Sequence, residues 1–220
     1  MNMRIYSLVM AGTLLLASCS KKNNRPEGQD GQSILISDLP GDTSATMADG
    51  GNNSFKNMYF SFTANEAVHI GEDDKKSLRW DLAFTGPYNA EIYVNSAANP
   101  YNPGYEGTGK GAIVQIDQPY DQVVTAPSDE SFDASAVTKI GWDAGNGTGW
   151  FFYSLANHIC VPIRNRTFVL RTAGGKYAKL EMINVYKGNP PVVTDLFWPA
   201  PYFTFRYYVQ QDGSRNLQTK

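Results

Sequence analysis

Residues 167–186 read TFVLRTAGGKYAKLEMINVY, and this stretch decides the fold class. Two strand-like flanks are present, residues 167–172 and 176–186, and the second alternates between apolar and polar side chains with period two from Ala178 to Met182, as half-buried strands do. Gly174 and Gly175 lie between them and can adopt the positive φ angles that a tight turn requires. The stretch therefore predicts an antiparallel hairpin.

The second flank also predicts which side chains enter the core. Its core-facing positions are Ala178, Leu180 and Met182. Because successive side chains of a strand point to opposite faces, we expect Lys179 and Glu181 to face water.

The same alternation recurs on both sides of the hairpin. Further strands are expected over residues 57–63, 80–85, 92–94, 112–116 and 202–209. In the second of these, Trp80, Leu82 and Phe84 would share one face. The stretch from Asn95 to Gly111 is rich in turn residues and predicts a loop. Residues 117–133 contain two prolines and fit edge segments better than central strands.

Composition agrees with an all-β class. The chain has 220 residues, of which 42% are apolar and 18% charged. Its 20 Gly, 12 Pro, 13 Tyr and 11 Phe favour short strands and many turns. Lys and Arg total 19 against 21 Asp and Glu, so no basic surface is expected and nucleic acid is excluded as a predicted partner. We expect one all-β domain of antiparallel sheets with long loops, over residues 34–220.

The N-terminus carries an export signal. A short positive region precedes an apolar run over residues 5–17, which is too short to span a membrane. The run ends in Leu16-Ala17-Ser18-Cys19, which resembles the lipobox of bacterial lipoproteins. We therefore expect residues 1–18 to be a signal peptide and Cys19 to carry the lipid that anchors the protein to a membrane. Residues 19–33 are polar and predict a tether.

Residue types that carry catalysis or hold metals are sparse. The chain has two His, His69 and His158, and it lacks zinc-protease, hydrolase, redox and nucleotide-binding motifs. Cys160 fits a small buried apolar residue better than a reactive thiol. Arg164 and Arg166 lie in a polar turn, where a solvated role is the simplest interpretation and a carboxylate contact is one of several others. We expect a protein that is not an enzyme.

Four motifs together resemble one known family. They are, in order, Trp80-Asp81-Leu82-Ala83-Phe84, Trp150-Phe-Phe-Tyr153, Asn157-His158 with Pro162, and Arg171-Thr-Ala-Gly-Gly-Lys176-Tyr-Ala-Lys179-Leu. This set is similar to the HmuY-like family of Bacteroidetes lipoproteins. The resemblance implies an all-β single domain at the outer membrane. It also implies capture of haem for a TonB-dependent outer-membrane receptor.

The haem ligands of that family are not matched. In its haem-binding type member an axial His directly follows the Trp-Asp motif, and the residue at this position is Thr85. The segment that carries the second His is short in this chain and contains no His or Met between Thr125 and Trp150. Iron also accepts Met, Cys or Tyr as axial ligands. The remaining candidates for holding haem are His158, Tyr101, Tyr105 and Met58.

Three functions stay open at this point. The leading hypothesis is a lipid-anchored protein that binds haem or another porphyrin. The second is a surface interaction module, or an accessory of an outer-membrane transporter, that has kept the fold without haem ligands. The third is a sugar-binding variant, which depends on the Trp-containing turns at Trp142 and Trp198. The sequence leaves the face of the outer membrane undecided.

Overall fold

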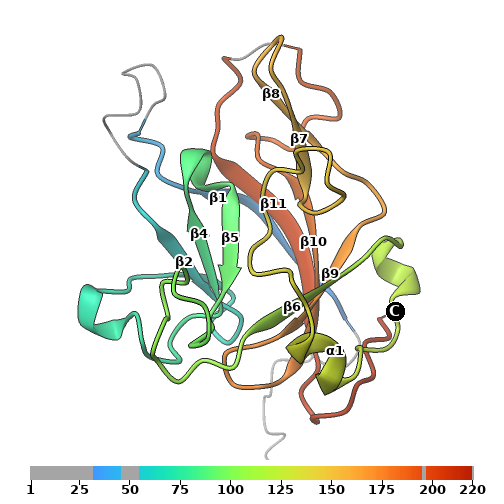
Figure 1. The fold of residues 1–220 in the computed structure, drawn as a ribbon. Helices are drawn as coiled ribbons and strands as arrows, with labels where there is room; N and C mark the ends of the chain where they lie inside the picture. Colours follow the sequence, from blue (N-terminus) through green and yellow to red (C-terminus); the bar gives the residue numbers. More distant parts are fainter. Residues whose placement is uncertain (1–31, 46–54, 195–196, 220) are drawn as a thin grey trace, which may run out of the picture.

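Antiparallel pairing connects the strands of this computed structural model, which describes residues 32–45, 55–194 and 197–219 (Figure 1). The strands are β1 (Ile34–Pro40), β2 (Met58–Ser61), β3 (Glu66–Val68), β4 (Leu82–Thr85), β5 (Glu91–Val94), β6 (Ala112–Ile116), β7 (Phe151–Ser154), β8 (Ile159–Pro162), β9 (Thr167–Arg171), β10 (Tyr177–Asn184) and β11 (Tyr202–Val209). The helical elements are α1 (Asp129–Asp133) and the 3-10 turns η1 (Glu72–Asp74), η2 (Pro87–Asn89) and η3 (Tyr120–Gln122). The all-β expectation is confirmed.

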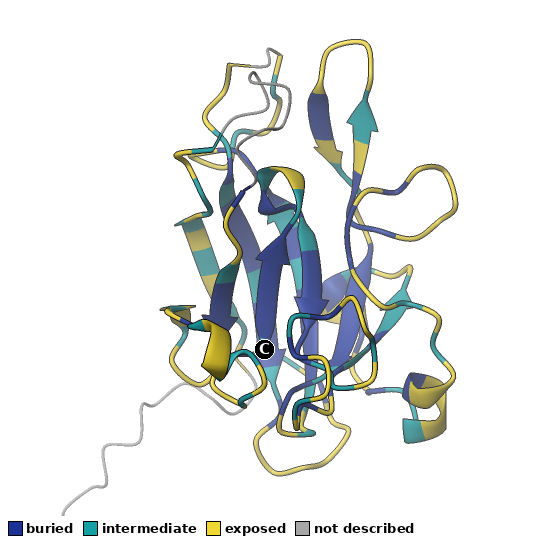
Figure 2. Cartoon of the chain, turned by 60° about the vertical axis from the view of Figure 1, so that its left-hand side comes forward, coloured by how far each residue is buried: buried dark blue, intermediate teal, exposed yellow. Residues whose placement is uncertain are grey.

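These strands form two sheets and a separate ribbon. The large sheet has the order β1-β11-β10-β9-β6, and the small sheet has the order β3-β2-β4-β5. β7 and β8 pair with each other and with no other described strand, and they project beyond the sheets in both ribbon views (Figures 1 and 2). Among the described residues, no helix has the length and apolar character needed to cross a membrane.

The main core lies between the two sheets, where buried strands fill the centre of Figure 2. Phe60 of the small sheet packs edge-on against Phe205 of the large sheet, with 5.2 Å between ring centroids. Phe84 and Phe203 also meet across the two sheets, in a tilted arrangement with 4.7 Å between ring centroids. Aromatic pairs of this kind add to the hydrophobic stabilisation that burial already provides. Alternation along the strands gives each sheet an apolar face, and these two faces pack against each other in the core.

The predicted hairpin is present as β9 and β10. Tyr177 pairs with Arg171, and the register continues to Leu180 opposite Phe168. The turn differs from the expected two-residue turn. Of its two glycines only Gly175 has a positive φ, at 85°, and its N–H donates to the carbonyl of Thr172. The connection is thus a three-residue loop with a left-handed glycine at its end, a common alternative in hairpins.

Lys179 corrects the prediction that the second face of β10 is solvated. Its side chain is 0% exposed, although Ala178 and Leu180 face the main core as expected. Lys179 Nζ donates to the carbonyls of Tyr120 and Val123, both at 3.1 Å, and lies 4.2 Å from the centroid of the Tyr120 ring. The segment that contains η3 and α1 therefore covers this face of the large sheet, and it does not form the edge strands expected for residues 117–133.

Burial of Lys179 predicts a dependence of stability on pH. Desolvation lowers the pKa of Lys179 to about 8. Between this value and the unfolded value of about 10.4, the unfolded chain binds more protons than the folded chain, so rising pH favours the folded state. We expect the unfolding free energy of the natural chain, relative to Lys179→Met, to increase by roughly 2–3 kcal/mol across this window.

Urea unfolding at a series of pH values measures this difference. Lys176→Met replaces an exposed lysine three residues earlier in the chain and is the matched control. The measured quantity is the unfolding free energy of the natural chain minus that of Lys179→Met. If this difference stays constant or falls as pH rises, the ammonium carries no desolvation cost in the folded state.

Trp80 corrects a second expectation. β4 begins at Leu82, so Trp80 does not share the face of Leu82 and Phe84. Instead it packs with Ala83 on the outer face of the small sheet and lies edge-on to Tyr59 at 5.1 Å. Its indole N–H donates to the carbonyl of Lys75 at 2.9 Å. Both faces of the small sheet are therefore covered.

Candidate functional site

A cleft of about 440 Å³ lies between the turn that follows β4, the loop around Trp142 and the ribbon β7–β8. Its lining residues are Pro87, Tyr88, Ala90, Glu91, Trp142, Phe151, Tyr153, His158 and Cys160. We call it the aromatic cleft, because Tyr, Trp and Phe rings come from all three elements. Its volume is within the range of small-molecule sites, about 300–1,000 Å³.

The turn that follows β4 is held in an unusual conformation. Tyr88 and Asn89 have φ angles of 53° and 51°, in the left-handed region that non-glycine residues rarely adopt. The buried Asn89 side chain accepts a hydrogen bond from Asp42 N at 2.7 Å and donates to the carbonyl of Lys56 at 2.9 Å. These contacts with distant segments compensate for the backbone strain. They place the Tyr88 ring on the cleft, where it also packs against Phe55 at 5.2 Å.

The wall that carries Trp142 is fixed by a buried ion pair. Asp143, the next residue, is 2% exposed and accepts a hydrogen bond from Arg166 at 2.8 Å. Its other oxygen accepts hydrogen bonds from Gly145 N and Gly147 N, so the carboxylate holds the backbone of its own loop in place. Burial alone would raise the pKa of Asp143, but these hydrogen bonds and Arg166 lower the pKa overall. Arg166 is therefore a buried structural residue, which corrects the interpretation of a solvated turn.

Trp150, directly before β7, connects two of the segments that border the cleft. Its indole is buried, and its N–H donates to the carbonyl of Ala90 at 2.9 Å, which ties the ribbon to the turn after β4. It also packs edge-on against Phe151 at 4.8 Å. The two sides of the cleft are thus joined through one side chain.

The ribbon presents one face to the cleft and the other to solvent. Phe151, Tyr153 and Cys160 line the cleft, whereas Phe152 and Val161 are exposed and pair directly with each other. This arrangement follows from period-two alternation in each strand. The ribbon therefore carries the aromatic rings of the cleft on its inner face.

His158 lies in the turn of the ribbon, with a φ of 57°. Its Nδ1 is 3.0 Å from the hydroxyl oxygen of Tyr153, and the two rings are 6.0 Å apart. A hydrogen bond at Nδ1 determines which tautomer the imidazole adopts. When Nδ1 donates its proton to the Tyr153 oxygen, Nε2 keeps a free electron pair.

A smaller cavity of about 220 Å³ adjoins the cleft, and we call it the side pocket. It is lined by Ala45, Tyr88, Tyr153, His158, Cys160, Val185, Tyr186 and residues 197–200. Four residues, Tyr88, Tyr153, His158 and Cys160, line both spaces. The Tyr153–His158 pair therefore lies where the cleft and the side pocket meet.

Burial keeps the other hydroxyl and thiol groups of the cleft protonated. Desolvation raises the pKa of the Cys160 thiol to about 12, which fits the small buried residue expected from the sequence. Desolvation also raises the pKa of Tyr88 and of Tyr153 above the usual tyrosine value. At neutral pH these groups are therefore neutral.

The structure brings only one of the four predicted haem-binding residues to this cleft. His158 lines it. Met58, at the start of β2, packs against the main core, where it pairs with Phe84. Tyr101 and Tyr105 belong to the loop after β5, at the opposite end of β4 and β5 from the cleft, and Tyr101 is 83% exposed.

Thr85 is a structural residue. It ends β4, is buried, and its hydroxyl donates to the carbonyl of Glu91 at 3.1 Å. The predicted lipidation site Cys19, the signal peptide 1–18 and most of the tether lie outside the described residues.

Phe151 and Tyr153 line the cleft although no donor motif in the sequence indicates them. Trp142 and Trp198, which the sequence suggests only as turns for sugar binding, line the cleft and the side pocket respectively. The signal available in the sequence is the aromatic run from Trp150 to Tyr153.

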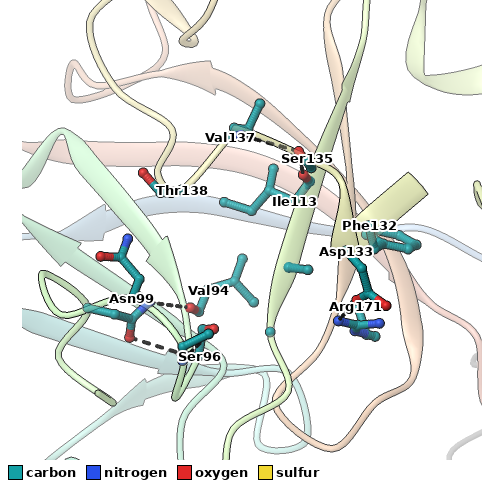
Figure 3. Close-up of a pocket in the computed structure, with 14 residues that line it drawn as sticks. Val94, Ser96, Asn99, Ile113, Phe132, Asp133, Ser135, Val137, Thr138 and Arg171 are labelled. Atoms are coloured by element: carbon teal, nitrogen blue, oxygen red, sulfur yellow. Dashed lines mark hydrogen bonds and ion pairs between the residues drawn. The ribbon is translucent and has the colours of Figure 1, made fainter. Parts of the chain in front are cut away.

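A second cleft, of about 280 Å³, has a more polar lining and is drawn in Figure 3. It lies between the loop after β5 and α1. Arg171 is already bonded to Asp133 at 2.8 Å and to the carbonyl of Lys110. The Asn102 amide likewise donates to the carbonyl of Val94. Because these polar groups are already partnered within the chain, this cleft is the weaker candidate.

Metal ligation by the protein alone has no support in the described part of the chain, where no three His, Cys, Asp or Glu side chains gather closely enough to hold an ion.

Comparisons with known proteins give structural matches only. No known family profile matches the sequence, and no curated protein matches it. The solved structures to which it is similar include a Bacteroides vulgatus protein described as HmuY-like and heme-binding, at 12% identity and TM-score 0.38, which covers 80% of this chain and 89% of that one.

Two further matches have similar values. A protein from Bacteroides fragilis described as a lipoprotein matches at 13% identity and TM-score 0.37, over 80% of this chain and 86% of that one. The apo HmuY analog of Tannerella forsythia matches at 11% identity and TM-score 0.39, over 84% of this chain and 98% of that one.

Proposed function

We propose that this chain is a non-enzymatic, lipid-anchored protein of the bacterial outer membrane whose aromatic cleft binds haem or a related planar tetrapyrrole. The observation that carries the proposal is the cleft itself, which rings from three elements line together with the exposed imidazole of His158. The motif resemblance to the HmuY-like family points to the same ligand.

The residues of the cleft fit haem chemically. A flat apolar ligand is held by ring faces and a few polar anchors. Tyr88, Trp142 and Phe151 supply ring surface, and His158 supplies the nitrogen that haem iron accepts as an axial ligand. Tyr153 would orient that imidazole through Nδ1, as hydrogen-bond partners of metal-binding histidines generally do.

Titration with ferric and then ferrous haem tests this function. The strands that the structure describes lie within residues 34–209, so a sample that begins at Ser20 contains them all. We expect a saturable shift of the Soret band with quenching of tryptophan fluorescence, because Trp142 lines the cleft. Unchanged spectra in both oxidation states would rule out haem as the ligand.

Tyr153→Phe is expected to weaken haem binding by about tenfold, at the lower end of the 10–100-fold effect typical of such positioning residues. The substitution keeps the ring and removes only the hydroxyl that contacts His158 Nδ1. Comparison of dissociation constants measures the effect. Tyr105→Phe, on the distant loop, is the matched control, and equal affinities for the two variants would contradict a role for the hydroxyl.

A second candidate function is a protein interaction at the membrane. Phe152 and Val161 form an exposed apolar pair on the outer face of the ribbon, and Leu155 at its turn is exposed as well. Contiguous exposed apolar side chains often mark partner surfaces. The partner that we propose is a TonB-dependent outer-membrane receptor, which the resemblance to the HmuY-like family implies.

Co-purification from solubilised outer membranes tests this partner. The natural chain, anchored through Cys19, is expected to retain a stoichiometric outer-membrane transporter that the variant Phe152→Ser/Val161→Ser loses. Recovery of the chain without any transporter would count against the interaction.

A further inference from the structure

We infer that the aromatic cleft opens away from the membrane, and that the opposite end of the domain rests on the lipid bilayer through Leu78, Tyr101 and Tyr105. This inference rests on the proposed function, because it starts from a lipid anchor at Cys19. It adds the orientation of the domain and a second contact with the bilayer.

The strands place the start of the described chain and the cleft at opposite ends of the domain. β1 begins at Ile34, which pairs with Tyr207 near the end of β11. It ends at Pro40, which pairs with Tyr202 at the start of β11. The N–H of Tyr202 donates to the carbonyl of Val185, a residue of the side pocket. Because a strand rises about 3.3 Å per residue, roughly 20–25 Å of β11 separates the two ends.

The loop after β5 lies at the same end as the start of β1. Gln32, the first described residue, lines a small space together with Phe62. The N–H of Phe62 donates to the Asp81 side chain at 2.8 Å, and the Asp81 carbonyl accepts from Asn95 N at 2.9 Å. We call this end, with Gln32, Phe62 and the loop that Asn95 begins, the tether end. Both ribbon views show that loop at the lower end and the ribbon β7–β8 at the upper end (Figures 1 and 2).

The chain between the anchor and the domain is short. Residues 20–31 separate Cys19 from Gln32. Because each residue spans at most about 3.6 Å, this segment keeps Gln32 within roughly 45 Å of Cys19 in any conformation. The anchor therefore holds the tether end near the bilayer, and a second contact at that end would fix the orientation.

The loop at the tether end is long and firmly held. The buried Asn95 amide donates to the carbonyl of Ser77 at 2.9 Å, and the buried Asn102 amide donates to that of Val94 at 2.7 Å. At Gly104 the Asn95 oxygen leaves no room for a Cβ. Loops of more than about 12–15 residues without regular structure are usually either functional or disordered. Since this loop is bonded to the domain at two buried asparagines, a function better explains its length.

This loop and the segment beside it expose aromatic and apolar side chains. Tyr101 is 83% exposed, Leu78 52% and Tyr105 38%. Leu78 directly follows Ser77, whose carbonyl the Asn95 amide holds next to the loop. Tyrosine is enriched at the level of lipid headgroups, because its ring is apolar and its hydroxyl reaches water. These three side chains therefore fit the interface of a bilayer.

The charges beside Leu78 do not favour an anionic surface. Three cations close to it in the sequence are each paired with a carboxylate, in the ion pairs Lys75–Glu72, Lys76–Glu106 and Arg79–Asp74. Paired cations offer little excess charge to attract anionic headgroups. We therefore expect the contact to form on neutral lipid and to persist at high salt, which screens exposed charges.

Fluorescence quenching by labelled lipids tests this orientation. The full chain, lipidated at Cys19, is reconstituted on phosphatidylcholine vesicles in which some headgroups carry a nitroxide quencher. A fluorophore is attached through Ala98→Cys in the loop or through Ala156→Cys in the turn of the ribbon, both at exposed positions. Both samples carry Cys160→Ala, so that only one thiol takes the label. We expect strong quenching at position 98 and little at position 156.

A double variant removes the proposed contact while leaving the anchor in place. Tyr101→Ser/Tyr105→Ser is expected to lower the quenching at position 98 and to raise it at position 156, because the anchor alone does not fix the orientation. Phe152→Ser/Val161→Ser, which changes exposed residues of the ribbon, is the matched control. This control should leave the quenching at both positions unchanged.

The outcomes separate this inference from the proposed function. Equal quenching at the two positions, or stronger quenching at position 156, would overturn the inference. Quenching that survives the two tyrosine substitutions, or that is lost at high salt, would overturn the contact through the rings. A haem titration of the same vesicles tests the ligand independently, so unequal quenching without a Soret shift would support the orientation and rule out haem. Recovery of the chain without a lipid on Cys19 would overturn the anchor and the inference together.

Discussion

Replacing Arg166 with methionine is expected to lower the free energy of unfolding by about 3–5 kcal/mol, the usual effect of breaking a buried ion pair from one side. Arg166 Nη1 lies 2.8 Å from the almost fully buried Asp143 carboxylate and also donates to the carbonyl of Gly149. Its Nε contacts Asp117 at 2.7 Å. Removing the guanidinium leaves the Asp143 charge desolvated and without its partner.

Urea unfolding followed by tryptophan fluorescence measures this loss. Arg164→Met is the matched control, because Arg164 lies in the same turn and is exposed. We expect the control to change stability by less than about 0.5 kcal/mol, as most surface substitutions do. Equal stabilities of the two variants would show that Arg166 is solvated, as the sequence alone suggested.

The second large effect is expected on ligand binding. His158→Asn should weaken ferric haem binding on the order of 100-fold, or about 2.8 kcal/mol at about 1.4 kcal/mol per tenfold. Asparagine suits this position because the backbone has a φ of 57°, which Asn tolerates better than most residues. The variant therefore removes the imidazole while keeping the turn of the ribbon.

His69→Asn provides the control for this variant. His69 is exposed and follows β3, away from the cleft. We expect the haem affinity of His69→Asn to match that of the natural chain in an equilibrium titration. If both variants bind haem as the natural chain does, His158 is not the axial ligand.

The sequence predicted the strands well where the pattern is local. β6 and β11 begin and end at the expected residues, and the hairpin of β9 and β10 has the expected partners. Alternation and turn residues act over a few positions, so they are visible in one stretch of chain. β1 was not predicted, because it pairs with β11 at the far end of the chain and is interrupted by a bulge.

Lys179 shows where such reasoning stops. Alternation correctly places its side chain on the face of the sheet away from Leu180. Alternation cannot predict which segment covers that face. The cover comes from Tyr120 and Val123, which are 59 and 56 residues away in sequence. The same limit applies to Arg166, whose partner Asp143 is 23 residues away. Charged residues in strand and turn patterns look solvated until distant segments pack on them.

The candidate site was only partly predictable for the same reason. Residue type alone indicates His158 as a donor, whereas Tyr101 and Tyr105 are candidates because the family resemblance places the loop over residues 95–111 near the pocket. In the structure, β5 begins next to the cleft and the loop follows the other end of this strand. The loop therefore lies away from the cleft. The companions of His158 come from separate segments around Tyr88 and Trp142, which no local pattern links.

The most direct test of the account uses the fact that the chain has two histidines. Labelling the imidazole rings with ¹³C and ¹⁵N gives one set of magnetic resonance signals for His158 and one for His69. On addition of one equivalent of ferric haem, we predict that the His158 signals shift or broaden beyond detection, because the paramagnetic iron lies against that ring, while the His69 signals stay in place. Unchanged His158 signals in a sample whose Soret band shows bound haem would contradict a ligand in the aromatic cleft.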